Sequence, residues 1–256
     1  MKVLYFDCKT TGTDPNRHGL IQLGQIIEVD GQVVSENVWN IQPFKSDEIV
    51  DEALVVNRIH RDDLFDNEKR LPVEAAWHEI QKSWDAVVDR FSPRDKFVLA
   101  GYNVDSFDQQ FLRRFIAKVT PNDRYSVAGC YLGHFTMDPL PYLKWLKVLG
   151  FLKLDNLKLQ TVCDHLGIQL KDAHDALADI RATRWLTKRV QRQIEEGQWA
   201  SDVTFLHVPT DGEATGQPIV GVDVDKDGRL LMHVEGPDLS PDMPGEPGKV
   251  DADAGN

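Results

Sequence analysis

The amino-acid sequence predicts an α/β fold in which helices flank a mixed five-stranded sheet, with a C-terminal β-hairpin extension. Short segments of strand type come first and are then interleaved with longer amphipathic segments of helical spacing. A tight turn joins two of the early strand segments, whereas helical segments separate the later strands. The early strands should therefore pair antiparallel, and the later ones should arrive by crossovers.

Three strands open the predicted sheet. Residues 3–7 form a nearly continuous apolar run, which is typical of a strand buried on both faces. Residues 20–29 and 33–41 are rich in strand-forming side chains, and Asp30-Gly31 between them is a strong hairpin turn. These segments form the antiparallel part of the sheet.

A second group of elements alternates helix and strand. Residues 73–91 carry apolar side chains with helical spacing, and Ser92-Pro93 should end that helix. Residues 97–100 form a short buried strand that leads into a helix beginning at Asp108. The remaining predictions are helices at 51–57, 141–149, 156–166 and 174–193 and a strand at 135–137.

The composition of the chain changes after the last of these helices. Residues 218–224 and 229–235 are rich in strand-forming side chains and predict a hairpin around 225–228. That turn also resembles the opening of a calcium loop, but Val234 stands where a closing carboxylate is required, which favours the turn. Proline, glycine and aspartate then dominate, as in disordered segments. The predicted domains are a main domain at 1–195, the hairpin extension at 196–236 and a disordered acidic tail at 237–256.

The formal net charge of −12 argues against long, non-specific binding to duplex nucleic acid, because phosphate contacts require Lys and Arg. Residues 233–256 hold six acids and one base, so they account for −5 of this charge. A site that collects metal ions is also acidic by itself. The charge therefore does not exclude binding of a short single strand.

Several sequence features indicate a cytoplasmic protein with no membrane segment. No apolar run is long enough to span a bilayer, and the N-terminus lacks the pattern of a signal peptide. The three cysteines are an odd number without close pairs, which favours a reducing compartment and offers no zinc-binding spacing.

Three acidic residues stand where a binding crevice is expected. Asp7 lies at the end of the first strand, Asp108 opens the helix after the fourth strand, and Asp179 lies on the helix at 174–193. Strand ends and a helix packed across them can meet in one crevice. Three ionised carboxylates cannot crowd together without cations. Two divalent ions would neutralise them, and an all-oxygen ligand set favours Mg²⁺ or Mn²⁺.

His174 stands at or just before the start of the same long helix and could serve as a proton shuttle near Asp179. Taken alone, a capping histidine on a surface helix is the simpler interpretation. Small residues on this helix would allow it to approach the sheet closely, namely Ala176, Ala178 and Ala182.

These motifs resemble those of the DnaQ-like proofreading exonucleases, in the DEDDh branch with three aspartates, one glutamate and one histidine. The resemblance rests on segments 7–12 and 101–108 and on the pair of His174 and Asp179, and it spans about residues 1–190. It implies a ribonuclease H-like sheet and a metal-dependent 3′→5′ exonuclease that releases nucleotides from single-stranded DNA or RNA ends.

The resemblance also implies a role for each motif residue. Asp7, Asp108 and Asp179 would hold two metal ions, and His174 would be the general base, which suits its ordinary pKa near neutrality. Asp105 is an additional acid beside the second motif, and a position at the cap or in the first turn of the helix explains it better than metal binding. The residues expected to contact the terminal nucleotide are Thr10, Thr11, Gly12, Asn103 and Phe107.

Lys9 departs from the family pattern, because it stands where the family has its glutamate. Residues two apart on a strand face the same side, so Lys9 should point where Asp7 points. Its ammonium should repel divalent cations and could pair with Asp7 or Asp179. The chain would then be an inactivated variant of an active exonuclease, a natural non-catalytic protein, or a weak one-metal enzyme. We favour the first, since every other motif residue is intact.

A competing interpretation is a non-catalytic subunit that keeps the fold as a platform for nucleic acid, a polymerase or another protein. Lys9 supports it, whereas the intact His174 opposes it, because a binding protein has little need of a general base. The sequence leaves open the preference for DNA or RNA and the oligomeric state. Cys8 should face away from Asp7 into the core.

Overall fold

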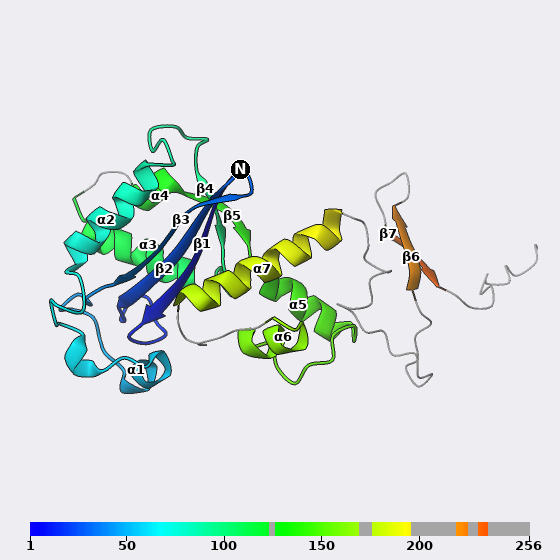
Figure 1. Ribbon diagram of the computed structural model, residues 1–256, viewed down its shortest axis with the longest axis horizontal. Helices are drawn as coiled ribbons and strands as arrows, with labels where there is room; N and C mark the ends of the chain where they lie inside the picture. The colour runs from blue at the N-terminus through cyan, green and yellow to red at the C-terminus, as the bar shows by residue number, and fades with distance from the viewer. Residues whose placement is uncertain (123–125, 169–175, 196–218, 225–229, 235–256) are drawn as a thin grey trace, which may run out of the picture. The chain divides into compact units, whose positions relative to one another are not determined.

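The computed structural model describes residues 1–122, 126–168, 176–195, 219–224 and 230–234 (Figure 1). The described residues fall into two compact units. The first runs from the N-terminus through the long helix that carries Asp179, and the second contains the two strands nearest the C-terminus.

The first unit is built on one five-stranded sheet in the order β3-β2-β1-β4-β5. The central strand β1 pairs antiparallel with β2, and β2 pairs antiparallel with β3. On its other side β1 pairs parallel with β4, and β4 pairs parallel with β5. The predicted mixed sheet is therefore confirmed. The strands are β1 (Lys2–Thr10), β2 (Leu20–Val29), β3 (Gln32–Asn40), β4 (Phe97–Ala100) and β5 (Leu132–Met137).

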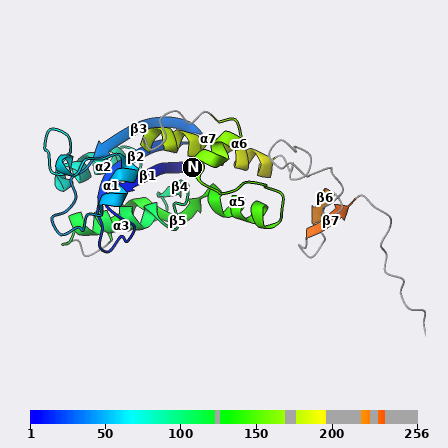
Figure 2. The same ribbon diagram turned by 90° about the horizontal axis from the view of Figure 1, so that it is seen from below.

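Helices cover both faces of this sheet, and Figure 2 shows β1 between α7 and α3. One face packs on α2 and α3, and the opposite face packs on α7. The helices are α1 (Asp51–Asn57), the 3-10 turn η1 (Arg61–Asp63), α2 (Val73–Asp85), α3 (Asp108–Val119), α4 (Val127–Tyr131), α5 (Pro139–Val148), α6 (Leu159–His165) and α7 (Ala176–Glu195).

The alternation of side chains along β1 decides what faces each layer. Leu4, Phe6 and Cys8 belong to the apolar cluster with α2 and α3, whereas Val3 and Tyr5 pack with Ile180 of α7. The odd positions of β1 therefore face α7. The next odd positions along the strand are Asp7 and Lys9.

Helix α7 lies unusually close to β2. A side chain at Gly24 would place its Cβ 2.8 Å from Ala176 Cβ and 2.8 Å from Ile180 Cδ1, so only glycine permits this approach. Farther along the helix, the buried Glu28 accepts hydrogen bonds from Arg184 Nε at 2.9 Å and from Lys188 Nζ at 2.6 Å. Close packing at one end and ion pairs at the other fix α7 against the sheet.

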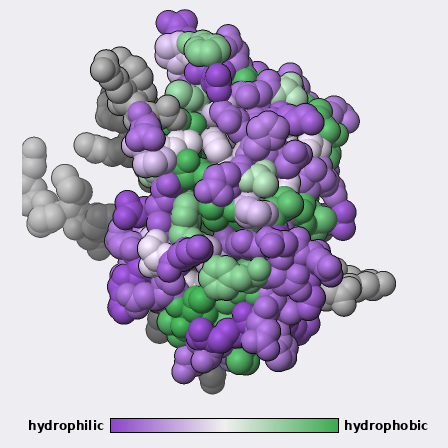
Figure 3. Space-filling view, turned by 90° about the vertical axis from the view of Figure 1, so that its left-hand side faces the viewer, coloured by the Kyte–Doolittle hydropathy of each residue, from purple (hydrophilic) through white to green (hydrophobic). Residues whose placement is uncertain are grey.

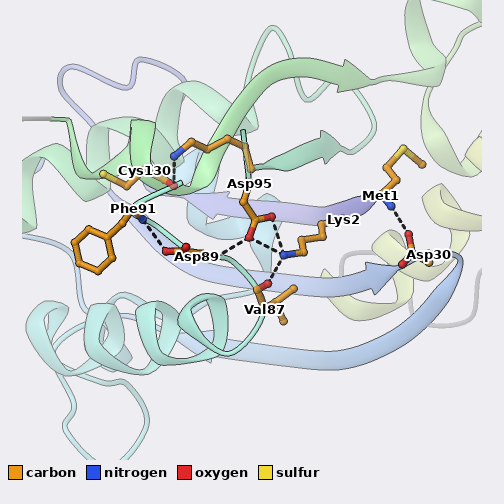
Figure 4. Close-up of polar contacts among 9 residues, drawn as sticks. Met1, Lys2, Asp30, Val87, Asp89, Phe91, Asp95 and Cys130 are labelled. Atoms are coloured by element: carbon orange, nitrogen blue, oxygen red, sulfur yellow. Dashed lines mark hydrogen bonds and ion pairs between the residues drawn. The ribbon is translucent and has the colours of Figure 1, made fainter. Parts of the chain in front are cut away.

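Helix α2 ends at Asp85, six residues before the end predicted from Ser92-Pro93. Lys2 Nζ donates to the Val87 carbonyl at 2.6 Å and to Asp95 Oδ2 at 2.7 Å (Figure 4). These two hydrogen bonds from the Lys2 side chain hold the segment that follows the helix. Tertiary hydrogen bonding therefore ends α2 before the proline is reached.

Two strand boundaries and one short helix also differ from the prediction. Strand β1 extends to Thr10 instead of ending at Asp7, because its pairing with β2 continues to Leu20. Strand β5 begins at Leu132, three residues early, where Leu132 pairs with Phe97. The short helix α4 was not predicted, although Ser126 caps it by accepting from the Gly129 N–H at 3.3 Å.

The second unit contains an antiparallel hairpin of β6 (Ile219–Val224) and β7 (Leu230–Val234), which confirms that predicted element. The turn at 225–228 and the acidic tail lie outside the described residues. Among the described helices, none combines the length and the apolar character needed to cross a bilayer. One face of the molecule is mainly hydrophilic, with separate apolar patches (Figure 3).

Candidate active site

The crossing of β1 and α7 brings together residues that are far apart in the sequence. Asp7 and Lys9 lie two residues apart on β1, on the face that packs against α7. Asp179 lies in the first turn of α7, and Asp108 is the first residue of α3. The fold therefore places Asp7, Lys9 and Asp179 at one crossing, and Asp108 at the start of the helix that packs on the other face of the sheet.

Lys9 bridges two of the aspartates. Its Nζ lies 2.8 Å from Asp7 Oδ2 and 2.8 Å from Asp179 Oδ2, and its side chain is only 9% exposed. Burial alone lowers the pKa of this ammonium, but the attraction of Asp7 and Asp179 outweighs burial and raises the pKa above its ordinary value. The lysine is therefore a charged, buried member of the site.

Asp108 completes the group from the other side of β1. Its Oδ1 accepts a hydrogen bond from the backbone N–H of Cys8 at 2.8 Å. Burial, followed by the charge of Asp7, raises the pKa of Asp108 well above its ordinary value. Cys8 itself is buried in the core, as predicted, and burial raises the pKa of its thiol.

The residues after Lys9 are held by the chain itself. Thr10 Oγ1 donates to the Gly12 carbonyl at 2.7 Å, and Thr11 Oγ1 donates to the Glu48 carbonyl at 2.6 Å. Gly12 packs directly on the ring of His18, where a Cβ would come within 2.4 Å. Both hydroxyls thus have internal partners, and a role of this segment in binding a nucleotide stays a prediction.

Asn103 and Phe107 lie on the loop between β4 and α3. Asn103 has a positive φ of 66°, a conformation that asparagine tolerates better than most residues. Its N–H donates to Asp138 Oδ1 at 3.0 Å. Phe107 directly precedes α3 and packs against Phe111, with the ring centroids 4.9 Å apart and the ring planes tilted by 46°. The loop is therefore shaped so that Asp108 begins the helix beside β1.

Asp138 is a supporting residue that the sequence analysis missed. The same Oδ1 that holds Asn103 also accepts from the Leu140 N–H at 3.0 Å, so it caps α5. Its position directly before Pro139 was a visible capping signal. Asn57 is a second such residue, because its Nδ2 donates to the Thr10 carbonyl at 2.9 Å.

His174 and Asp105 are the remaining predicted residues. His174 lies outside the described residues, so its place beside Asp179 stays a prediction. Asp105 is not the cap of α3, because the helix begins at Asp108 and Phe107 occupies the capping position. The carboxylate of Asp105 instead accepts from Thr136 Oγ1 at 2.9 Å, which ties the loop to β5.

The site as folded does not fit the expected pair of metal ions. Its carboxylate oxygens would suit Mg²⁺ or Mn²⁺, but Lys9 already holds Asp7 and Asp179. A divalent ion on the same oxygens would face direct repulsion from the ammonium. In the part of the chain that the structure describes, no group of three or more His, Cys, Asp or Glu side chains is placed to hold a metal.

Several solved structures of E. coli exonuclease I share this fold. The complex with a dT13 oligonucleotide has a TM-score of 0.61 and 21% sequence identity, over 78% of this chain and 43% of that chain. The zinc-bound complex with single-stranded DNA has a TM-score of 0.60 and 20% identity, over 76% and 42%. The metal-free complex gives 0.59 and 19%, over 76% and 40%. The likeness agrees with the predicted ribonuclease H-like fold.

This chain spans less than half of the length of those solved structures. A comparison with curated proteins gave no match. The family model RNase_T, described as an exonuclease, matches residues 4–186, which include β1 through most of α7. Because this match covers most of the chain, the protein belongs to the RNase_T exonuclease family, as its resemblance to the DnaQ-like enzymes implies.

Proposed function

We propose that this chain is a 3′→5′ exonuclease-type domain that engages the 3′ end of single-stranded DNA or RNA, and that Lys9 impairs its hydrolytic activity. The observation that carries this proposal is the position of Lys9 Nζ, 2.8 Å from both Asp7 and Asp179. Asp7, Asp108 and Asp179 are the aspartates that the resemblance implies, so the departure from the family pattern is confined to Lys9 among these described residues.

Membership of the exonuclease family supports the nuclease part of the proposal. Several of the similar solved structures are complexes of E. coli exonuclease I with oligonucleotides or single-stranded DNA, which supports a single strand as the ligand. One of them is a metal-free complex with single-stranded DNA. Strand binding and metal binding are therefore separable in that protein, and we propose the same for this chain.

The family chemistry would require Mg²⁺ or Mn²⁺ on Asp7, Asp108 and Asp179, with His174 as the general base. The Lys9 ammonium already occupies oxygens of two of these carboxylates. A glutamate at this position would remove the competing charge and add a carboxylate to the set. We therefore expect the lysine alone to weaken or abolish hydrolysis, without any change elsewhere in the fold.

The test compares the chain with its Lys9→Glu variant on labelled single strands of DNA and RNA in Mn²⁺. We expect Lys9→Glu to release nucleotides from a free 3′ end at a rate on the order of 100-fold above the unchanged chain. A strand with a blocked 3′ end should resist both proteins. Lys69→Glu is the matched control, because Lys69 is exposed and pairs with Asp63 far from the site in sequence.

A non-catalytic binding subunit is the second candidate, and the same ion pairs favour it. Lys9 offsets one of the two negative charges of Asp7 and Asp179 without any external cation, which suits a stable binding platform. A Lys9→Glu protein that folds, binds single strands and releases no nucleotide in Mn²⁺ would support this candidate. A polymerase or another protein would then be the partner to seek.

A further inference from the structure

The Lys9 ammonium is buried at the crossing of β1 and α7, where the neighbouring carboxylates require a positive charge. Asp7 on β1 and Asp179 on α7 each present Oδ2 to Lys9 Nζ at 2.8 Å. Asp179 is 12% exposed and Lys9 is 9% exposed on their side chains, so water contributes little screening between them. Two carboxylates from separate elements are thus joined by one internal cation.

An internal ammonium and a divalent ion are alternative solutions to the same electrostatic problem. Carboxylates that converge in a buried crevice need a positive charge, which either a bound metal or a neighbouring side chain can supply. A lysine in place of a glutamate raises the formal charge of the site by two units. The lysine is tethered to β1, so it is present at full occupancy whatever the metal concentration.

We infer that Lys9 is a built-in replacement for a metal ion, which closes this site to divalent cations and leaves the folded site independent of them. The ammonium contacts an oxygen of Asp7 and an oxygen of Asp179 simultaneously. A metal ion could use those oxygens only after displacing a buried, ion-paired side chain.

A consequence for strand binding rests on the proposed function. If the site receives a 3′ end, the lysine lowers the repulsion between the carboxylates and the terminal phosphate without any metal. Binding of a single strand should therefore be equally tight in chelator and in Mn²⁺. The Lys9→Glu variant should instead bind the strand more tightly when Mn²⁺ is supplied.

The first experiment measures Mn²⁺ binding to the full chain through the electron paramagnetic resonance signal of free Mn²⁺. We expect the Mn²⁺ affinities of the unchanged chain and its Asp179→Asn variant to agree within about twofold. Any Mn²⁺ that these two proteins bind would then lie at sites elsewhere on the chain. Lys9→Glu should gain an Mn²⁺ site that is at least about tenfold tighter than any site of the unchanged chain. Adding Asp179→Asn to Lys9→Glu should abolish that gain.

An unchanged chain that binds Mn²⁺ at least about tenfold more tightly than its Asp179→Asn variant would overturn the inference. That comparison does not require Lys9→Glu to fold, so it decides the matter alone if that variant is unstable. A Lys9→Glu protein that folds but gains no Mn²⁺ site would also overturn it, since the lysine would not then be what excludes the metal.

The second experiment measures binding of a short 5′-fluorescein oligothymidylate by anisotropy, in chelator and in Mn²⁺. Equal affinity of the unchanged chain in both buffers is expected, whereas binding that requires Mn²⁺ contradicts the inference. No binding by either protein in either buffer would instead refute the proposed function. The Mn²⁺ measurement on the protein alone would still decide the role of Lys9.

Discussion

At the scale of single residues, Lys9 should be the side chain on which the stability of the site depends. Replacing it by Met keeps a long apolar stem but leaves Asp7 and Asp179 facing each other without the ammonium. Removing one partner of a buried ion pair costs about 3–5 kcal/mol, and the 28% exposure of Asp7 reduces this to about 2–3 kcal/mol. Urea denaturation of Lys9→Met and the unchanged chain measures the loss.

The matched control for this prediction is Lys69→Met. Lys69 contacts Asp63 at 2.6 Å, but its side chain is 56% exposed. Lys69→Met should therefore change the unfolding free energy far less than Lys9→Met does, because water competes for both charges of an exposed pair. Equal losses in the two variants would show that the buried bridge of Lys9 has no special energetic role.

Asp108 should make the stability of the chain depend on pH. Burial and the charge of Asp7 raise its pKa above the ordinary 3.8, so the fold favours the protonated carboxyl. The stability that protonation contributes is complete below that ordinary value and is lost as pH rises through the raised pKa. Asp108→Asn retains an acceptor for the Cys8 N–H but cannot ionise.

The unfolding free energy of Asp108→Asn should therefore rise relative to the unchanged chain as pH increases. Within the window between the two pKa values the gain is at most about 1.4 kcal/mol per pH unit. Urea denaturation of both proteins between about pH 5 and about pH 8 tests this. A difference that stays constant across the range would mean that Asp108 keeps its charge in the fold.

The sequence could predict which side of β1 Lys9 occupies, but not how many partners it has. The two-residue period of a strand places Lys9 beside Asp7. The second contact, with Asp179, depends on how closely α7 crosses β1, and that distance is decided by Gly24 and Ala176. The Thr10 carbonyl accepts from Asn57 and the Thr11 hydroxyl donates to the Glu48 carbonyl, and both partners lie in distant segments that no local pattern reveals.

At the scale of elements, Glu28 should decide how firmly α7 is held. Its side chain is 1% exposed and pairs with Arg184 at 2.7 Å and with Lys188 at 2.6 Å. Burial by itself raises the pKa of Glu28, but Lys188 and Arg184 outweigh burial and lower it. Glu28→Gln should therefore lower the unfolding free energy by about 1–3 kcal/mol near neutral pH.

This loss should disappear on acidification. A carboxyl with a lowered pKa contributes stability above its ordinary value of 4.5, and the contribution is lost as pH falls through the lowered pKa. Urea denaturation of Glu28→Gln at neutral and acidic pH measures both parts. Glu48→Gln is the control, because Glu48 is 53% exposed in its pair with Arg17 and its replacement should cost much less stability than that of the buried Glu28.

Local patterns predicted the existence of most elements better than their ends. Helix α2 has the predicted apolar stripe, with Ala76, Ile80 and Trp84 buried, yet it stops at Asp85. The hydrogen bond from Lys2 to the chain beyond the helix joins residues 85 positions apart, which periodicity cannot show. Helix α4 was missed because five residues are too few for a helical repeat to be recognised.

At the scale of the whole molecule, the mixed sheet could be predicted because two kinds of connection are visible in the sequence. The Asp30-Gly31 turn makes β2 and β3 antiparallel, and both residues have the positive φ that such a turn requires. Helical segments before β4 and β5 require crossovers, and both strands are parallel to their neighbours.

The net charge of −12 leads to the last prediction, which concerns the salt dependence of strand binding. An acidic chain can neutralise few phosphates, so we expect about three contacts or fewer and a slope of log K against log salt no steeper than about −2. Raising salt from about 50 to about 200 mM should then weaken binding of an oligothymidylate by roughly 20-fold at most. Anisotropy titrations on a single strand and on a blunt duplex measure this, and the duplex should bind far more weakly because the net negative charge of the chain opposes its dense phosphates. A slope near −5, or equal affinity for the duplex, would indicate a broad basic surface and contradict binding of a short strand end.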